Sequence, residues 1–93
     1  MKKSTIVSEV IESTKLPKKD VVLVIDTMLD VITDSLRAGD SVSISGFGSF
    51  LLVERKAKEL FLPGTTTKVY VAAKRAVRFR PSKRLKETIE EVS

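Results

Sequence analysis

Apolar positions in the first third of the chain recur at helical spacing. They predict a short amphipathic helix from an N-cap at Ser4 to about Thr14. A second, longer helix is predicted from Pro17, which suits a first turn, to Ala38. Gly39 is expected to end it, because glycine adopts the left-handed conformation that follows a last turn at little cost. The periodic residues of the first helix are Ile6, Val7, Val10 and Ile11.

The predicted second helix carries two apolar stripes, whereas packing on one neighbouring helix needs only one. In a chain of 93 residues, a helix that is apolar on two sides indicates a subunit interface, because the remaining chain is too short to enclose it. A fully enclosed helix in a monomer is the alternative. One stripe consists of Val22, Ile25, Leu29, Ile32 and Leu36, and the other of Val21, Val24, Met28 and Val31.

After Gly39 the pattern changes to a period of two, as in half-buried strands. Residues 41–45 alternate serine with aliphatic residues, Gly46-Phe47-Gly48 predicts a turn, and 49–58 predicts the returning strand. A third strand over 68–80 has an apolar and a cationic face. The apolar face holds Val69, Val71, Ala73, Val77 and Phe79, and the cationic face holds Lys68, Tyr70, Lys74, Arg78 and Arg80. Because Phe47, Phe50 and Phe79 follow the apolar period, they are expected in the core.

The segment 60–67 contains a Pro-Gly pair and three threonines, which predicts the tip of a projecting ribbon. Pro81 is expected to stop the third strand, and Ser82 to cap a last helix. The whole pattern predicts one α+β domain over 1–93. It divides into a helical dimerisation part at 1–39, a three-stranded antiparallel sheet at 40–81 with a β-ribbon arm at about 55–74, and a C-terminal helix at 82–93.

Charge is distributed unevenly along this pattern. Residues 1–51 hold 6 basic and 7 acidic side chains, whereas 52–93 hold 11 basic and 5 acidic ones. Within 55–86, 11 lysines and arginines face the single acid Glu59. A field this strong attracts polyanions, either nucleic acid or an anionic membrane. The membrane is the weaker candidate, because the cations alternate along a strand instead of lining an amphipathic helix.

The chain contains no cysteine and no histidine, and its serines, lysines and acids form no nucleophile or metal constellation. We therefore expect no enzyme, catalytic residue, metal, cofactor or small-molecule substrate. The longest apolar run, 21–25, is too short to span a bilayer, and no signal sequence is visible at the N-terminus. A soluble, cytoplasmic, nucleoid-associated protein is expected.

Several motifs together resemble the bacterial histone-like HU and integration host factor family. They are Gly46-Phe47-Gly48-Ser49-Phe50, Glu54-Arg55, Pro63, and Phe79-Arg80-Pro81-Ser82-Lys83 followed by Leu85 and Lys86. The resemblance covers nearly the whole chain. It implies an intertwined dimer whose two β-ribbon arms enter the minor groove of double-stranded DNA, while the saddle between them contacts phosphates.

When the family's functional positions are matched to this sequence, the resemblance implies phosphate contacts on the arm, on its flank and at the first helix. It also implies that Pro63 is a wedge between base pairs. The basic third strand and the apolar tip add further candidates. The complete predicted DNA-binding set is Lys3, Arg55, Lys58, Phe61, Leu62, Pro63, Lys74, Arg75, Arg78, Arg80, Lys83 and Lys86. Lys3 and Asp26 match family positions that pair on the surface, so Lys3 is expected to exchange its acid partner for phosphate.

The tip departs from the family pattern. Where the family usually has Arg-Asn-Pro, this chain has Phe61-Leu62-Pro63, and Val53 and Ala72 replace a basic residue and a proline. Losing an arginine weakens attraction to a narrow minor groove, while Phe61 and Leu62 supply larger wedges. Adjacent exposed apolar residues on a turn indicate a binding site, and insertion into DNA and contact with a protein both stay open.

The function favoured by these features is a histone-like architectural protein that bends and compacts duplex DNA with weak sequence preference. The alternatives are a site-selective bender like integration host factor, and a module of the same fold that docks a protein through its apolar tips. A homodimer is expected, and a heterodimer with a homologous chain stays open.

Overall fold

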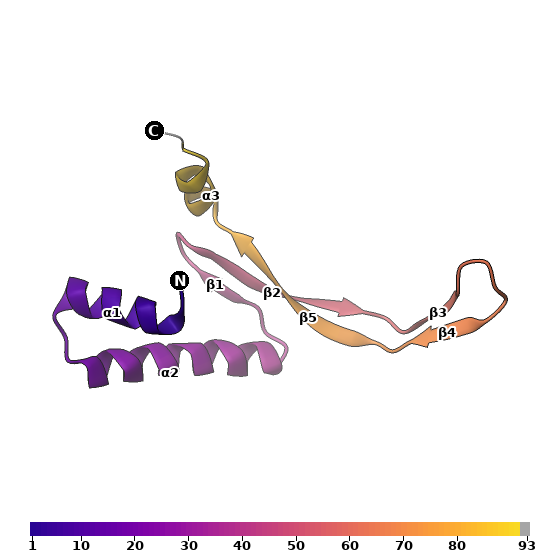
Figure 1. The fold of residues 1–93 in the computed structure, drawn as a ribbon, viewed down its shortest axis with the longest axis horizontal. Coiled ribbons are helices and arrows are strands. Elements are labelled where there is room, and N and C mark those ends of the chain that lie inside the picture. Colours follow the sequence, from indigo (N-terminus) through magenta and orange to yellow (C-terminus); the bar gives the residue numbers. More distant parts are fainter. Residues whose placement is uncertain (92–93) are drawn as a thin grey trace.

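The computed structural model describes residues 1–91, and it shows two packed helices, a twisted sheet and a long projecting ribbon (Figure 1). The molecule measures 63 × 36 × 22 Å, which is long for a chain of 93 residues because the ribbon extends far from the helices. The C-terminal helix predicted over 82–93 is α3, Lys83–Glu90, and positions 92–93 lie outside the described residues. None of the helices in the described part is long and apolar enough to cross a membrane.

The first two helices, α1 (Lys3–Thr14) and α2 (Lys18–Arg37), lie side by side (Figure 1). Ser4 was predicted as the N-cap of the first helix, and this is wrong. The N-cap is Lys2, and Ser4 lies inside the first turn, where its carbonyl accepts a hydrogen bond from the Ser8 hydroxyl at 3.1 Å. The first amides of α1 need no side-chain acceptor, because water can satisfy them at this exposed end.

The end of α2 agrees with the sequence analysis. Gly39 adopts a φ of 98°, and its amide donates to the Leu36 carbonyl, while the Asp40 amide donates to the Ser35 carbonyl. This pair of hydrogen bonds is the Schellman arrangement that satisfies the last carbonyls of a helix. The chain thereby leaves α2 directly into the sheet.

The predicted three-stranded antiparallel sheet is confirmed, in the order β1-β2-β5. Its strands are β1 (Val42–Ile44), β2 (Gly48–Arg55) and β5 (Lys74–Pro81). The turn between β1 and β2 packs against the end of β5. A Cβ on Gly48 would lie 2.5 Å from the Phe79 ring and 2.7 Å from the Arg80 carbonyl oxygen, so only glycine fits there. The Ser82 amide also donates to the Phe47 carbonyl, which fixes the start of α3, and the Ser82 hydroxyl caps α3 as predicted.

Beyond the sheet, the chain forms a two-stranded ribbon of β3 (Lys58–Phe61) and β4 (Lys68–Val71). The sequence predicted one continuous strand on each side of the arm, whereas both strands are interrupted at 56–57 and 72–73. Arg55 pairs with Lys74, and Lys58 pairs with Val71. Two residues therefore lie between these pairs on both strands, so neither strand carries an extra residue at the interruption.

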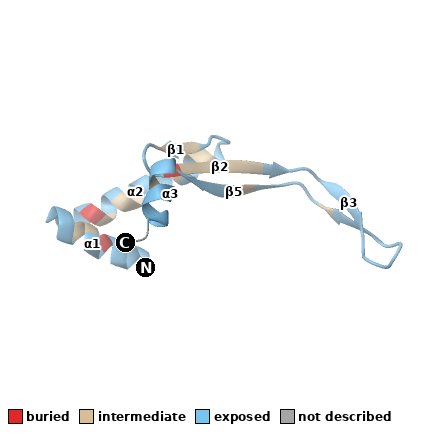
Figure 2. Cartoon of the chain, turned by 90° about the horizontal axis from the view of Figure 1, so that it is seen from above, coloured by how far each residue is buried: buried red, intermediate tan, exposed pale blue. Residues whose placement is uncertain are grey.

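Little of the apolar surface is buried within one chain (Figure 2). Val7 and Val21 are the buried hydrophobic residues among those described. The first stripe of α2 is mostly half-buried, but Val24 and Val31 of the second stripe are 65% and 62% exposed. Together with Leu23, Met28 and Ile44 they line an open apolar groove of about 660 Å³. Val21 of the second stripe is buried, but Val24, Met28 and Val31 are exposed, so one chain leaves most of this stripe open.

The three phenylalanines expected in the core contact one another but remain partly exposed. The Phe79 ring centroid lies 5.5 Å from that of Phe47 and 5.2 Å from that of Phe50, in tilted arrangements. Phe47 is 46% and Phe79 40% exposed. The aromatic cluster therefore forms a core that one chain leaves partly open, in keeping with the exposed stripe of α2.

Candidate nucleic-acid interface

Cross-strand register divides the β2–β5 ribbon into two faces. Phe50 pairs with Phe79 and Leu52 with Val77, and these residues share the face that packs toward α2, which we call the core face. The opposite face, which we call the basic face, carries four cations. They are Arg55, Lys74, Arg78 and Arg80. The predicted division into an apolar and a cationic face is therefore correct for this part of the ribbon.

The basic face is not uniformly charged. Arg80 pairs with Ser49 and Arg78 with Leu51, while Ala76 pairs with Val53. Three of the four cations thus lie on β5, the strand that leads into α3, and β2 supplies mainly apolar surface until Arg55. All four cations are exposed, so phosphate can reach their charged groups.

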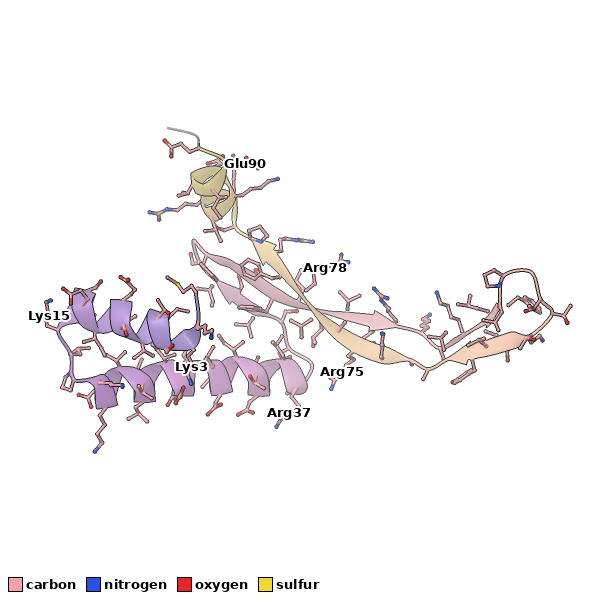
Figure 3. The ribbon with its side chains drawn as sticks, viewed as in Figure 1. Lys3, Lys15, Arg37, Arg75, Arg78 and Glu90 are labelled. Carbon is pink, nitrogen blue, oxygen red and sulfur yellow. The ribbon has the colours of Figure 1, made fainter. Side chains whose placement is uncertain are left out.

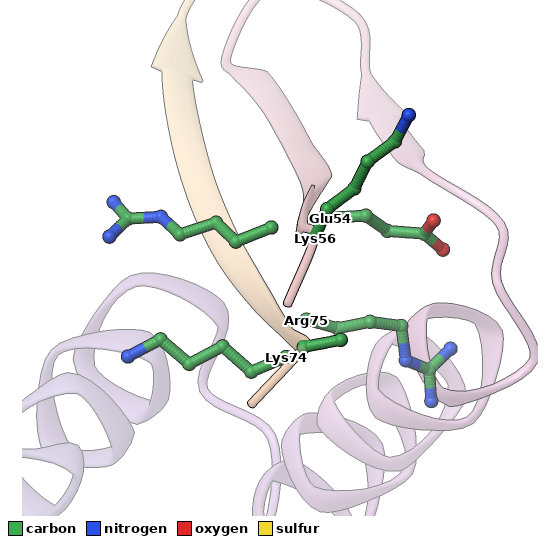
Figure 4. Close-up of a pocket in the computed structure, with 6 residues that line it drawn as sticks. Glu54, Lys56, Lys74 and Arg75 are labelled. Atoms are coloured by element: carbon green, nitrogen blue, oxygen red, sulfur yellow. The ribbon is translucent and has the colours of Figure 1, made fainter. Parts of the chain in front are cut away.

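Arg75 was included in the predicted DNA-binding set, but the structure places it on the other face. It pairs with Glu54, and one of its guanidinium nitrogens donates to the Arg37 carbonyl at 3.2 Å. In Figure 3, Arg75 lies on the side of α2 and Arg78 on the opposite side of the ribbon. Figure 4 shows the same divergence between Lys74 and Arg75 at the outer end of the sheet. Because a cation at a helix C-terminus is favourable, Arg75 joins the ribbon to the end of α2.

The interruption of the ribbon forms a shallow pocket of about 360 Å³ beside these residues (Figure 4). Its lining includes Lys56, a cation that the sequence analysis did not select. Lys56 follows the last residue of β2 and is exposed. The sequence shows that Lys56 is a cation. It does not show that β2 ends at Arg55 and leaves Lys56 outside the alternating strand.

The tip of the ribbon is a tight turn over Leu62-Pro63-Gly64-Thr65. The Thr65 amide donates to the Leu62 carbonyl at 3.1 Å, and Gly64 has a φ of 73°. This is the geometry of a type II turn, in which proline precedes a residue with positive φ. The Leu62 amide donates to the Thr67 carbonyl and closes the loop. Leu62 is 45% exposed, so an apolar side chain stands beside Pro63 at the tip.

Phe61 does not belong to this turn, contrary to the prediction that 60–67 forms the tip. It is the last residue of β3 and pairs with Lys68 of β4, whose ammonium lies 5.9 Å from the centre of the Phe61 ring. Leu60 likewise pairs with Val69. The ribbon is longer than predicted because these apolar residues have cross-strand partners, which a sequence window of turn residues does not show.

Alternation within β3 and β4 divides the distal arm into two faces. Phe61, Lys68 and Tyr70 lie together with Glu59 on one of them. We call these four residues the distal front. Lys58 pairs with Val71 on the other side of the distal ribbon, and it lines one pocket of about 410 Å³ with Arg55 and Lys74 at the interruption.

The remaining predicted cations lie outside the ribbon and have acidic neighbours. Lys3 of α1 forms an ion pair with Asp26 of α2, as expected (Figure 3). On α3, Lys83 lies 3.9 Å from Glu87, and Lys86 lies 4.0 Å from Glu90. Exposed pairs of this kind are worth less than about 1 kcal/mol, so phosphate can replace the carboxylates at small cost.

Arg84 is a further cation that the sequence analysis did not select. It lies on α3, and one of its guanidinium nitrogens approaches the turn at Gly46, 4.0 Å from where a Cβ on that glycine would lie. It therefore extends the positive charge of α3 toward the sheet. No sequence signal distinguished it from an ordinary surface arginine.

Comparison with known proteins gives consistent results over the whole chain. The model of the bacterial DNA-binding protein family matches residues 1–90. The DNA-binding protein HU of Campylobacter jejuni is 39% identical over 93 residues, which is all of this chain and 95% of that protein. HU-1 of Halalkalibacterium halodurans is 38% identical over 90 residues, covering 97% of this chain and 100% of that protein.

Solved structures show the same similarity. An Anabaena HU structure crystallised with DNA matches with a TM-score of 0.82 and 34% identity, over 97% of this chain and 98% of that one. HU from Thermotoga maritima matches with a TM-score of 0.70 and 32% identity, over 97% and 100%. The helices, the sheet and the ribbon arm are thus similar to those of proteins that include one crystallised on DNA.

Proposed function

The chain belongs to the bacterial DNA-binding protein family, and on this premise we propose that it is a histone-like architectural protein that bends and compacts double-stranded DNA with weak sequence preference. The family consists of structural DNA-binding proteins, not enzymes, and its members are dimeric. The observation that carries the proposal is the basic face, where four exposed cations lie on one side of the ribbon that leads from α3 to the arm.

The dimeric state of the family agrees with the apolar surfaces that one chain leaves exposed. The second stripe of α2, the groove beside it and the open edge of the phenylalanine cluster are apolar surfaces that a monomer would present to water. Burial of apolar surface contributes about 25 cal/mol per Å², so association of two chains over these surfaces is favourable. Two arms then project from one body, and the chain works as a single DNA-binding domain in this proposal.

Phosphate contacts are assigned to the cations that the structure leaves accessible. They are Lys3, Arg55, Lys58, Lys74, Arg78, Arg80, Lys83 and Lys86. Lys58 lines one pocket with Arg55 and Lys74, so its ammonium can reach phosphate beside theirs. Arg75 is left out because its guanidinium is bound to α2. These contacts release counterions from DNA and are blind to sequence.

The wedge is assigned to the turn at the tip. Leu62 and Pro63 stand at the end of the arm, where a side chain can enter between base pairs in the minor groove. Unstacking a step costs a few kcal/mol, which the insertion of an apolar side chain offsets by covering the exposed base faces and bending the duplex onto more protein. Phe61 and Tyr70 of the distal front lie behind this turn and would face the groove along the arm.

Double-stranded DNA is the ligand in this proposal, with no membrane and no small-molecule substrate. Among the described residues, no group of three or more acids is arranged to hold a metal ion. We place the protein in the bacterial cytoplasm on the nucleoid, where its DNA is found.

A binding and bending measurement tests the proposal. Affinity and bend angle are measured for random, A-tract and nicked or gapped duplexes of one length at one salt concentration. The proposal expects tighter binding to the nicked or gapped duplex, which bends at less cost, and a small difference between random and A-tract sequences. Strong preference for one intact sequence would instead identify a site-selective bender. Equal binding to all three without bending would contradict the architectural role.

A further inference from the structure

The aromatic residues of the chain, four phenylalanines and one tyrosine, divide into two groups. Phe47, Phe50 and Phe79 form the cluster beside the sheet. The other two, Phe61 and Tyr70, both belong to the distal front. Phe61 is 63% and Tyr70 69% exposed. Both aromatic rings that lie outside the cluster are therefore accessible on one face of the distal arm.

The register makes these two rings diagonal neighbours. Phe61 pairs with Lys68, and Glu59 pairs with Tyr70. Diagonal positions on one face of a ribbon lie about 7–8 Å apart, so the rings share one small surface. The Lys68 ammonium lies 5.9 Å from the centre of the Phe61 ring and 3.8 Å from a carboxylate oxygen of Glu59. The distal front thus combines two exposed rings with one ion pair.

Stacking on flat rings is the interaction that such a surface offers to nucleic acid. Every base has a face that can stack on an aromatic side chain, whatever its sequence. In an intact duplex those faces are covered by neighbouring base pairs, and the grooves expose only base edges. We propose that Phe61 and Tyr70 form a stacking platform for unpaired bases, such as those of a single-stranded gap in DNA.

A protein partner suits the distal front less well than unpaired bases do. A protein that covered both rings would also bury Glu59 and Lys68, and burial of charged groups is costly without new polar partners. Bases carry hydrogen-bond donors and acceptors at their edges, to which a carboxylate and an ammonium can bind. The mixture of rings and charges therefore favours bases as the occupant.

A cationic pocket adjoins the platform along the strands. Tyr70 is followed by Val71, which pairs with Lys58, and both of these residues line the pocket of about 410 Å³ at the interruption of the ribbon. Surfaces that bind single strands combine aromatic rings with cations that hold the backbone. This phosphate contact rests on the proposed DNA binding, whereas stacking on the rings is a separate contact. The other cations that line the pocket are Arg55, Lys56 and Lys74.

Two gapped duplexes that differ only in their bases test the platform. Both have the same length, flanking sequence and gap, but the unpaired strand carries thymines in one and abasic sites in the other. Their phosphates are the same and the abasic gap bends at least as easily, so neither charge nor flexibility favours the thymine gap. We expect wild type to bind the thymine gap about tenfold more tightly, as stacking of a base does. Equal affinity would overturn the proposal and leave a protein as the occupant of the rings.

Tyr70 provides a direct signal of stacking. It is the single tyrosine of a chain without tryptophan, so the intrinsic fluorescence of the protein comes from this ring of the distal front. A base stacked on the ring quenches its emission. We expect emission to fall clearly when the thymine gap saturates the protein and to change little with the abasic gap. Unchanged emission with the thymine gap would contradict stacking on Tyr70.

Variants distinguish the rings from apolar bulk. Phe61→Leu and Tyr70→Leu each remove a ring and keep an apolar side chain, whereas Phe61→Tyr and Tyr70→Phe keep a ring at the same position. We expect each leucine variant to lose most of the preference for the thymine gap while binding the abasic gap as wild type does. The variants that keep a ring should keep the preference. An equal loss of affinity for both gaps in the leucine variants would show that the rings support the arm and do not bind bases.

The platform and the proposed function fail in different ways. Tight binding to intact and gapped duplexes, with equal affinity for both gaps and no quenching, would remove the platform alone. Binding to the thymine gap with quenching, but without affinity for the intact duplex, would contradict the architectural role and support the platform. Absence of binding to every duplex would remove both.

Discussion

The inner and the distal halves of the ribbon are built from the same two strands but carry opposite kinds of surface. The inner half, β2 with β5 and the interruption, holds six lysines and arginines against the single acid Glu54. Helix α2 packs against part of one of its faces. The distal half, residues 58–71, holds two lysines and one glutamate, and its apolar side chains are exposed on both faces. Attraction of DNA is therefore concentrated near the body, and apolar anchoring near the tip.

This separation means that the two halves should respond differently to salt. Contacts with phosphates weaken steeply as salt rises, because they depend on the release of counterions. Insertion of an apolar side chain depends on desolvation and stacking, which salt affects little. Variants of the two halves can therefore be distinguished by the slope of affinity against salt.

The largest effect is expected from removing the basic face. Replacing Arg55, Arg78 and Arg80 together by alanine should lower the affinity for duplex DNA by about 100-fold or more at low salt and reduce the salt slope by about one per cation removed. Affinity measured by fluorescence anisotropy over a salt series checks this. An unchanged slope would show that the inner ribbon is not where phosphates are bound.

The next effect concerns stability and compares two glycines, one in each half. Gly48→Ala places a Cβ against the Phe79 ring and the Arg80 carbonyl, and should destabilise the fold by about 2 kcal/mol, as overpacking does. Gly64→Ala at the tip meets nothing within 4 Å but strains a positive φ, which costs about 1 kcal/mol in the arm alone. Thermal unfolding should therefore show a lower Tm for Gly48→Ala and little change for Gly64→Ala. Equal shifts would mean that the arm and the sheet unfold as one unit.

A smaller effect is expected at the tip. Leu62→Ser should reduce the bend angle and lower affinity about tenfold, equivalent to about 1.4 kcal/mol, while leaving the salt slope as in wild type. Bending measured by energy transfer between labelled duplex ends, with anisotropy for affinity, checks this. Leu62→Met serves as the control, since it keeps an apolar side chain of similar volume. A change in salt slope would show that the tip acts on phosphates instead.

The smallest effect distinguishes two neighbouring arginines of β5. Arg75→Ala removes one hydrogen bond to α2 and should lower the free energy of unfolding by about 1 kcal/mol, with the salt slope of DNA binding nearly unchanged. Arg78→Ala should reduce that slope by about one and leave stability nearly unchanged. Denaturant unfolding and salt titration of both variants check the pair. If Arg75→Ala also reduced the slope by one, its assignment to α2 would be wrong.

Much of the fold was predictable because its signals are local. The end of α2 at Gly39, the cap at Ser82 and the division of 68–80 into two faces depend on neighbouring residues alone, and the structure agrees with each. The errors arose where partners distant in sequence decide. Ser4 was taken as a cap because its residue type favours one, and 60–61 was taken as turn because its partners on β4 were not considered.

The candidate site shows the same contrast between local signals and contacts distant in sequence. Lys74, Arg78 and Arg80 were correctly grouped, since alternation along one strand places them on one face. Arg75 was included for its charge, which does not show that the end of α2 lies beside it. Lys58 was grouped with Arg55 on the arm, and the two residues line one pocket at the interruption of the ribbon.

The sequence by itself determined the helices, the alternating strands, the basic stretch and the apolar departure at 61–62, because residue type and spacing carry these features. Tertiary structure decided which cations share a face, that Phe61 belongs to a strand, and that Arg75 lies beside the end of α2. These features depend on which residues pair across neighbouring strands and on which elements pack against each face. Such contacts join residues far apart in the chain, and no local pattern records them.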